Sequence, residues 1–240
     1  MEDEIIGSVR SAFSDALVSL FVVGSYATYD IVDGYSDYDL LAFVADPTRT
    51  PKNINFEKLS AKYSVALKCT VRPIADLQNR ILGNDRATRF IGNLDLLDLK
   101  LRARLLYGKN IADDIPEVHE LLKRDLRSEL RAEYAHATDP DPVKNIFVRE
   151  PQDWCNYIIN MSGAILLSGG ITGNKKLFPE LLQSYHPDFK GISSLEEALA
   201  LRSSKIILHL DRQQRDDFKI TLGSFLDEYR RYVFNQRDVK

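Results

Sequence analysis

Two aspartates that stand two positions apart, Asp37 and Asp39, have the residue type and spacing to bind a metal ion. They open an apolar run, Leu40 to Val44, which is rich in residues favoured in strands. Because side chains alternate across a strand, carboxylates at positions i and i+2 point to the same face. Two carboxylates that close repel each other unless a cation lies between them. The pair therefore predicts a site for a hard divalent ion such as Mg²⁺, which is bound by one or two carboxylates together with substrate phosphates.

A glycine and a serine, Gly24 and Ser25, follow an earlier apolar run, Phe21 to Val23. A glycine allows the backbone to approach a phosphate closely. The Ser25 hydroxyl and the nearby backbone N–H groups can bond phosphate oxygens at the start of the following segment. The two runs and the residues between them therefore predict a strand, a phosphate-binding turn and a second strand that carries the carboxylates.

The runs Val23-Gly24-Ser25 and Ser36-Asp37-Tyr38-Asp39-Leu40-Leu41 together resemble the signature of the polymerase-β-type nucleotidyltransferase superfamily. Within that superfamily the chain is most similar to the aminoglycoside adenylyltransferases. The resemblance implies that the Gly-Ser turn and Ser36 hold a nucleoside triphosphate and that the two aspartates ligate Mg²⁺. It also implies an α+β fold, in which a small mixed-sheet nucleotidyltransferase domain is followed by an all-α helical bundle.

The composition is that of a soluble globular protein. The chain has 240 residues, of which 44% are hydrophobic and 28% are charged, enough for one large or two modest domains. Its net charge of −3 gives no general attraction to nucleic acid or to an anionic membrane, so a long nucleic acid is not the expected partner. Cys69 and Cys155 form no metal or redox motif, and no signal peptide or membrane-spanning run is found. We expect a cytoplasmic protein.

Strand-like runs alternate with short helical patterns in the first part of the chain, which is typical of a small domain that combines helices with a sheet. We expect helices at 3–16, 56–62 and 74–82, strands at 18–23, 38–45 and 63–72, and a short helix that ends in a loop over 26–36.

From about residue 85 onward the apolar residues recur with a helical period. Leu94, Leu97, Leu101 and the pair at 105–106 form one stripe, which predicts a helix that ends at Gly108. The predicted domains are therefore 1–109, the nucleotidyltransferase domain, and 110–240, a helical acceptor-binding or lid domain. Within the second domain we expect a bundle of helices at 117–137, 152–168, 176–185, 194–207 and 211–235.

The third predicted strand carries Lys68 at the position where the resemblance implies a glutamate, within Ala66-Leu67-Lys68-Cys69-Thr70-Val71. By alternation, Lys68 and Thr70 share the face that can meet Asp37 and Asp39. A lysine about 4 Å from a carboxylate interacts by on the order of 4 kcal/mol at an effective dielectric constant of about 20. That is enough to compete with a weakly bound Mg²⁺.

Three interpretations of Lys68 stay open. Lys68 replaces one metal ion and contacts a phosphate while the aspartates hold the other ion. It pairs with the aspartates in a protein that binds nucleotide without turnover. Or the third acid is supplied by Glu57 or Asp76.

In the second domain, the glycine-rich run 169–176 ends in Lys175 and Lys176. The resemblance implies a lysine near this place that reaches the triphosphate; the alternative is a solvated turn with surface lysines. Asp153 and Trp154 open the preceding helix and are candidates for the acceptor pocket, although a tryptophan there can also serve packing.

The predicted function is that of a Mg²⁺-dependent nucleotidyltransferase. It moves a nucleoside monophosphate, with AMP from ATP favoured, to a hydroxyl of a small acceptor such as an aminoglycoside-like molecule. The alternative is a catalytically degenerate nucleotide-binding or regulatory protein of the same fold, for which Lys68 is the support. Arg131 and His136 have the spacing of a pair in helical ribonuclease domains, but no second signature accompanies them, and we assign them no role.

Overall fold

The computed structural model describes residues 1–46, 56–82 and 92–235. The chain divides into two compact units, Met1–Lys123 and Arg124–Lys240. The division lies further along the chain than the boundary expected after residue 109. The reason is local packing, because the segment that contains α5 (Val118–Leu121) lies against α4 (Asn93–Leu101) of the first unit, where Lys100 Nζ donates to the Ile115 carbonyl at 2.7 Å.

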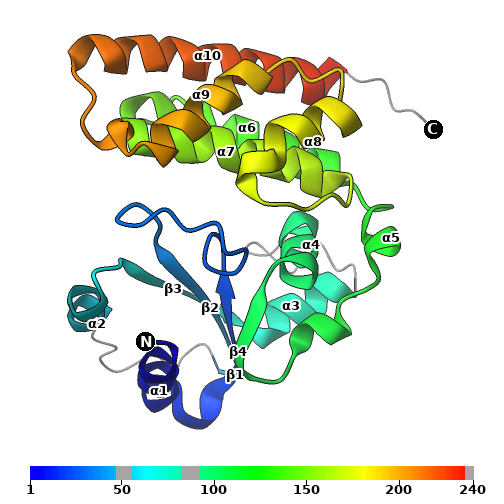
Figure 1. Ribbon diagram of the computed structural model, residues 1–240. Helices are drawn as coiled ribbons and strands as arrows, with labels where there is room; N and C mark the ends of the chain where they lie inside the picture. The colour runs from blue at the N-terminus through cyan, green and yellow to red at the C-terminus, as the bar shows by residue number, and fades with distance from the viewer. Residues whose placement is uncertain (47–55, 83–91, 236–240) are drawn as a thin grey trace. The chain divides into compact units, whose positions relative to one another are not determined.

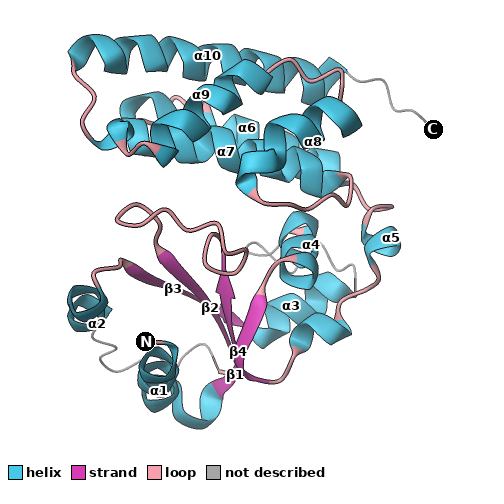
Figure 2. Ribbon diagram, in the orientation of Figure 1, coloured by secondary structure: helices cyan, strands magenta, loops and turns pink. Residues whose placement is uncertain are grey.

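The first unit is built on a four-stranded mixed sheet (Figures 1 and 2). Its order is β3-β2-β1-β4, with bounds β1 Leu17–Val23, β2 Tyr38–Val44, β3 Leu67–Pro73 and β4 Arg104–Gly108. β1 is antiparallel to both of its neighbours, and β2 is parallel to β3. The expected strands at 18–23 and 38–45 are confirmed within a residue, and the third strand begins at Leu67 rather than at residue 63.

The sheet has two different faces. The core face packs against α1 (Glu2–Phe13) and α2 (Phe56–Tyr63) through side chains such as Tyr38, Leu40 and Leu67. The site face carries the alternate residues of the strands, among them Asp39, Leu41, Phe43, Thr70 and Arg72. Figure 1 shows α1 and α2 on one side of the sheet and α3 (Ile74–Ile81) and α4 on the other. The alternation expected for the third strand is confirmed, since Cys69 and Val71 pack with the core face.

The prediction of one helix that ends at Gly108 is wrong, because α4 ends at Leu101 and residues 104–108 form β4. Leu105 pairs with Phe21 of β1, so the free edge of the sheet supplies backbone partners that a helix would otherwise supply. Gly108 has φ +86°, and a Cβ there would lie 2.2 Å from the Val18 carbonyl oxygen. The glycine therefore permits a close approach to β1, instead of ending a helix.

The second unit is a bundle of helices, as predicted. Its central helix is α7 (Pro151–Ser168), which is apolar and buried along most of its length and contacts the other four long helices. These are α6 (Leu126–Ala137), α8 (Phe178–Tyr185), α9 (Ile192–Ser203) and α10 (Arg212–Asn235). The single helix expected over 117–137 is instead two, α5 and α6, and Asp125 caps the second by accepting from the Ser128 N–H at 3.0 Å.

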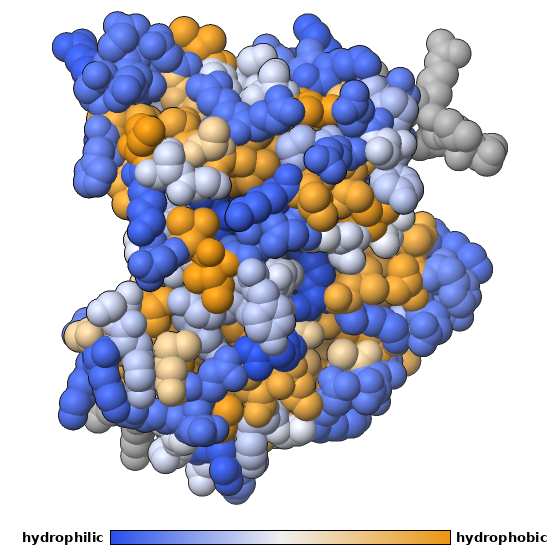
Figure 3. Space-filling view, viewed as in Figure 1, coloured by the Kyte–Doolittle hydropathy of each residue, from blue (hydrophilic) through white to orange (hydrophobic). Residues whose placement is uncertain are grey.

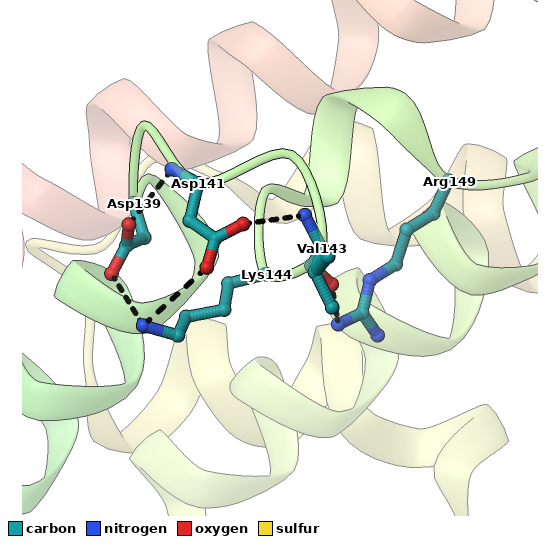
Figure 4. Close-up of polar contacts among 5 residues, drawn as sticks. All are labelled: Asp139, Asp141, Val143, Lys144 and Arg149. Atoms are coloured by element: carbon teal, nitrogen blue, oxygen red, sulfur yellow. Dashed lines mark hydrogen bonds and ion pairs between the residues drawn. The ribbon is translucent and has the colours of Figure 1, made fainter.

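The loop between α6 and α7 is held by its own acidic residues (Figure 4). Asp139 accepts from the Asp141 N–H at 2.9 Å, and Asp141 accepts from the Val143 N–H at 3.0 Å. The Lys144 ammonium lies 3.4 Å from one carboxylate and 3.8 Å from the other. The hydrogen bond from the Asp141 N–H lowers the pKa of Asp139. These bonds hold the path of the chain between the end of α6 and α7.

Hydrophilic residues cover much of the visible surface of each unit, with smaller hydrophobic groups between them (Figure 3). Within the described ranges, no helix combines the length and the apolar character needed to cross a membrane.

Candidate active site

The turn after β1 brings the backbone against one of the two aspartates. Val23, the last residue of β1, pairs with Asp39 of β2. The next residue, Gly24, has φ +68°, and a Cβ on it would lie 3.3 Å from Asp39 Oδ2. A glycine satisfies both conditions at once, because it adopts positive φ without strain and leaves room for the carboxylate. The predicted phosphate-binding turn and the predicted metal ligand are therefore neighbours in space.

The segment after Gly24 is a series of turns, so the short helix expected within 26–36 is wrong. The Gly24 carbonyl accepts from the N–H of Thr28 at 3.2 Å, and the Ser25 carbonyl accepts from the N–H of Asp30 at 2.8 Å. Tyr29 has φ +57°, a left-handed conformation that cannot continue a right-handed helix. The interruption keeps the segment compact directly beside the strand end.

Ser36 closes the loop that leads into the two acids. Its hydroxyl accepts from the Val32 N–H at 2.9 Å, and its own N–H donates to the Val32 carbonyl at 2.8 Å. The side chain is buried. These bonds fix the chain immediately before Asp37; the nucleotide-binding role expected for Ser36 stays a prediction.

Lys68 lies beside the two aspartates, as the alternation predicts. Asp39 and Lys68 are register partners across the parallel β2–β3 pair, and Lys68 Nζ forms an ion pair with Asp37 Oδ2. The side chains of Lys68 and Asp37 are 65% and 30% exposed. An ion pair that is so exposed to water contributes about 1 kcal/mol or less to stability, well below the value for a buried pair. The ammonium can therefore leave Asp37 when a cation or a phosphate competes for it.

Neither Glu57 nor Asp76, the two alternatives for the third acid, lies beside Asp37 and Asp39. Glu57 lies on α2, which covers the core face, whereas Asp39 points to the site face. Asp76 follows the far end of β3, separated from Lys68 by roughly 17 Å of strand at about 3.3 Å per residue. In the part of the chain that the structure describes, no group of three His, Cys, Asp or Glu residues could hold a metal ion. Two carboxylates are the donor set that a Mg²⁺ ion uses when its other ligands are phosphates and water, so the residue types of Asp37 and Asp39 suit that ion.

A cavity of about 270 Å³ adjoins Asp39 on the site face. Strands β2 and β3 line one side, where Thr70 and Arg72 contribute polar groups, and α4 lines the other with Asp95 and Asp98. Both acids of α4 already have partners, since Asp95 accepts from the Gly92 N–H at 2.7 Å and Asp98 pairs with Arg102. The sequence shows no signal for this grouping, because only the docking of α4 on the sheet places its acids near Asp39.

Lys175 and Lys176 lie in the second unit, in the short 3₁₀ turn that precedes α8. Asn174 caps that turn by accepting from the Lys176 N–H at 3.0 Å, and Gly170 takes φ +72° earlier in the loop. Lys176 is exposed and Lys175 is half-buried. Their predicted contact with a triphosphate stays a prediction.

Trp154, a predicted acceptor-binding residue, is instead buried inside the second unit. Its side chain is only 6% exposed, its indole N–H donates to the Ile146 carbonyl at 2.7 Å, and its ring packs on Phe218. A buried ring whose one polar atom is already bonded serves packing. Asp153 is exposed in the first turn of α7 and remains a candidate. Arg131 stacks over the Phe234 ring, which also accounts for it structurally.

Comparison with known proteins identifies the fold. No protein-family model matches the chain, and no curated protein matches it. Among solved structures it is similar to spectinomycin adenyltransferase AAD(9) from Enterococcus faecialis with ATP and spectinomycin, with a TM-score of 0.57, 13% identity, and coverage of 95% of this chain and 99% of that one. A mutant of the toxin-antitoxin MntA-HpeT matches 55% of this chain and 94% of its own, with a TM-score of 0.36 and 18% identity. A toxin-antitoxin structure with AMP-PNP matches 55% of this chain and 93% of its own, with a TM-score of 0.35 and 19% identity. The chain thus has a fold similar to that of this spectinomycin adenyltransferase over nearly its whole length.

Proposed function

We propose that the protein is a Mg²⁺-dependent nucleotidyltransferase that moves a nucleoside monophosphate, AMP from ATP, to a hydroxyl of a small acceptor. The observation that carries the proposal is the contact between the turn and the acids. Gly24 lies against Asp39, which is on the site face of the sheet, and Asp37 and Asp39 flank Tyr38, which is on the core face. A phosphate-binding turn beside a pair of carboxylates is the arrangement that a metal-bound triphosphate requires.

In the first unit, different residues would bind the metal ion and the phosphates of the nucleotide. Mg²⁺, when bound, neutralises charge on the phosphates, so that the acceptor hydroxyl can attack the α-phosphorus in line. Asp37 and Asp39 would hold the ion. Gly24 and Ser25 would present backbone N–H groups and a hydroxyl to the phosphate oxygens. Lys68, once it leaves Asp37, is a second cation within reach of the same phosphates, which is the first of the three interpretations given above.

The second unit supplies the other candidate groups. Lys175 and Lys176 present ammonium groups before a helix N-terminus, a combination that favours an anion such as a triphosphate. Asp153 is the candidate for contact with the acceptor. The structure of AAD(9) was solved with ATP and spectinomycin, which supports ATP as donor and a hydroxylated, aminoglycoside-like molecule as acceptor.

The second candidate function is a nucleotide-binding or regulatory protein without turnover, and the Lys68–Asp37 ion pair favours it. In that protein the ammonium would stay on Asp37 and take the place of the metal ion. The two functions differ in whether nucleotide binding depends on Mg²⁺ and in whether the α-phosphate is transferred.

The deciding experiment uses α-labelled ATP with a panel of hydroxylated acceptors, run with the wild type and with Asp37→Asn/Asp39→Asn. Transfer of label that is lost in the double variant supports the enzyme; transfer that survives it refutes the assignment of the carboxylates. A calorimetric titration of ATP at a series of Mg²⁺ concentrations is run in parallel. ATP binding with no dependence on Mg²⁺ supports the regulatory alternative.

Lys68→Glu tests the role of the lysine. If the ammonium competes with metal, the variant binds Mg²⁺ more tightly in the presence of ATP. If the lysine also contacts the phosphates, turnover falls at the same time. Lys62→Glu is the matched control, because Lys62 is a similarly exposed lysine of the same unit, paired with Glu4 on α1.

A further inference from the structure

A carboxylate at the start of α1 ties together two strands that lie on either side of β1. Glu2 Oε1 accepts from the Tyr38 hydroxyl at 2.8 Å and from Arg104 NH2 at 2.6 Å, and Glu2 Oε2 accepts from Arg104 NH1 at 3.1 Å. The Arg104 contact is therefore the bidentate fork that binds most strongly. The hydrogen bonds from Arg104 hold the pKa of Glu2 below its usual value, so the carboxylate is ionised at neutral pH.

This cluster, made of Glu2, Arg104 and Tyr38, also contacts the turn that follows Gly24. The ring of Tyr26 packs on the ring of Tyr38, with centroids 4.7 Å apart. The guanidinium of Arg104 lies 5.9 Å from the centroid of Tyr29, the residue with the left-handed backbone. Both tyrosines belong to the segment that continues from the Gly-Ser turn. Two of the three side chains, Tyr38 and Arg104, therefore contact the segment after the Gly-Ser turn, and Glu2 binds both of them.

Tyr38 stands between the two candidate metal ligands in the chain. Because side chains alternate along β2, fixing Tyr38 on the core face fixes the direction in which the neighbouring carboxylates leave the strand. Tyr38 is fully buried, and its hydroxyl is held by Glu2. Arg104 in turn binds Glu2 to β4. The register partner of Arg104 in β1 is Val22, two residues before Gly24.

We propose that Glu2 and Arg104 are positioning residues of the candidate site, which act through Tyr38 to hold Asp37 and Asp39 at a set distance from the Gly24–Ser25 turn. The inference rests on the proposed function, since it concerns the binding of Mg²⁺ and ATP at that site. Neither residue touches the bound groups. Their effect is to keep the carboxylates and the turn in one arrangement before the ligand arrives, which lowers the cost of binding.

The chain contains a matched cluster that lacks this link to the site. Glu4 accepts from Lys62 Nζ and from the Tyr63 hydroxyl, so it has the same kinds of partner as Glu2. Its partners lie on α2, away from the strand that carries the acids. A purely structural role for a glutamate in the first turn of α1 is therefore shared by Glu2 and Glu4, while a positioning role belongs to Glu2 alone.

The experiment measures ATP binding by calorimetry over a series of Mg²⁺ concentrations, together with the thermal unfolding midpoint, for the full chain. The variants are Glu2→Gln, Arg104→Met, Tyr38→Phe and the control Glu4→Gln. We expect the first three to raise the Mg²⁺ concentration for half-maximal ATP binding by roughly tenfold, the lower end of the range for groups that orient metal ligands. Arg104→Lys keeps the charge but not the fork, so it should have a smaller effect.

The outcomes separate the inference from the proposed function. A shift in Mg²⁺ dependence in the Glu2 and Arg104 variants, with a wild-type value in the Glu4 control, supports the positioning role. Unchanged Mg²⁺ dependence in the variants, or an equal shift in the control, overturns it while Mg²⁺-dependent ATP binding by the wild type stands. A wild type that binds no ATP with Mg²⁺ overturns both. If Glu2→Gln does not fold, Tyr38→Phe decides, because it removes one hydroxyl and keeps the buried ring.

Discussion

Replacing Gly24 with alanine tests the contact on which the proposed function depends. The residue has φ +68°, and an L-amino acid in that region costs roughly 1–2 kcal/mol. The new Cβ would lie 3.3 Å from Asp39 Oδ2, so the carboxylate must move by a few tenths of an ångström. We therefore expect the free energy of unfolding to fall by about 1–2 kcal/mol, nearly all of it from the backbone.

The functional consequence of Gly24→Ala is larger than its effect on stability. The methyl group occupies the place where the turn meets Asp39, and it displaces one of the two candidate metal ligands. ATP binding in the presence of Mg²⁺ should weaken, and nucleotidyl transfer should weaken with it. Urea denaturation gives the stability, and calorimetric titration of ATP with saturating Mg²⁺ gives the affinity.

Gly7→Ala is the control in the same unit. Gly7 lies in α1, is exposed, and has no atom within 4 Å of the position that a Cβ would take. Alanine in a helix interior should raise the free energy of unfolding by roughly 0.5–1 kcal/mol and leave ATP binding unchanged. If Gly24→Ala binds Mg²⁺ and ATP like the wild type, the contact between the turn and Asp39 is not part of a nucleotide site, and the reasoning is refuted.

Three further substitutions test other parts of the fold. Gly108→Ala should prevent folding of the first unit, because its Cβ would lie 2.2 Å from the Val18 carbonyl oxygen; a circular dichroism spectrum and melting curve like those of the wild type would contradict this. Trp154→Phe should destabilise the second unit by about 1–3 kcal/mol, since the buried Ile146 carbonyl loses its donor, while the KM for any acceptor stays constant; a raised KM would restore the acceptor-binding role. Burial lowers the pKa of His186, so the folded protein favours the neutral ring, and stability should be lost as the pH falls below the usual value of about 6.5. His186→Gln should reduce that loss between pH 7.5 and pH 5 in urea denaturation, and an unchanged loss would contradict the assignment.

The sequence by itself determined the elements that depend on local pattern. A period of two along β2 places Asp37 and Asp39 on one side and Tyr38 on the other, whatever else the chain does. The same rule placed Lys68 on the side of the acids. The sequence also predicted a turn at Gly24-Ser25, and the structure gives Gly24 a positive φ, which few other residues adopt. Most helices of the second unit also follow from their own apolar periodicity, and α7, α8 and α10 have boundaries within two residues of those expected.

Only the tertiary structure decided the elements whose local pattern is ambiguous. The run at 104–108 fits a helical stripe as well as a strand, and it forms β4 because the edge of β1 offers backbone partners. Trp154 opens a helix in sequence, but the surrounding helices bury it.

Contacts between residues far apart in the chain were also outside the reach of the sequence. Glu2, Tyr38 and Arg104 come from three separate elements, and no periodicity relates them. Their meeting depends on how α1 packs across the sheet. The same holds for the α4 acids beside Asp39, since local pattern fixes which side of a helix is polar but not which strand that side faces.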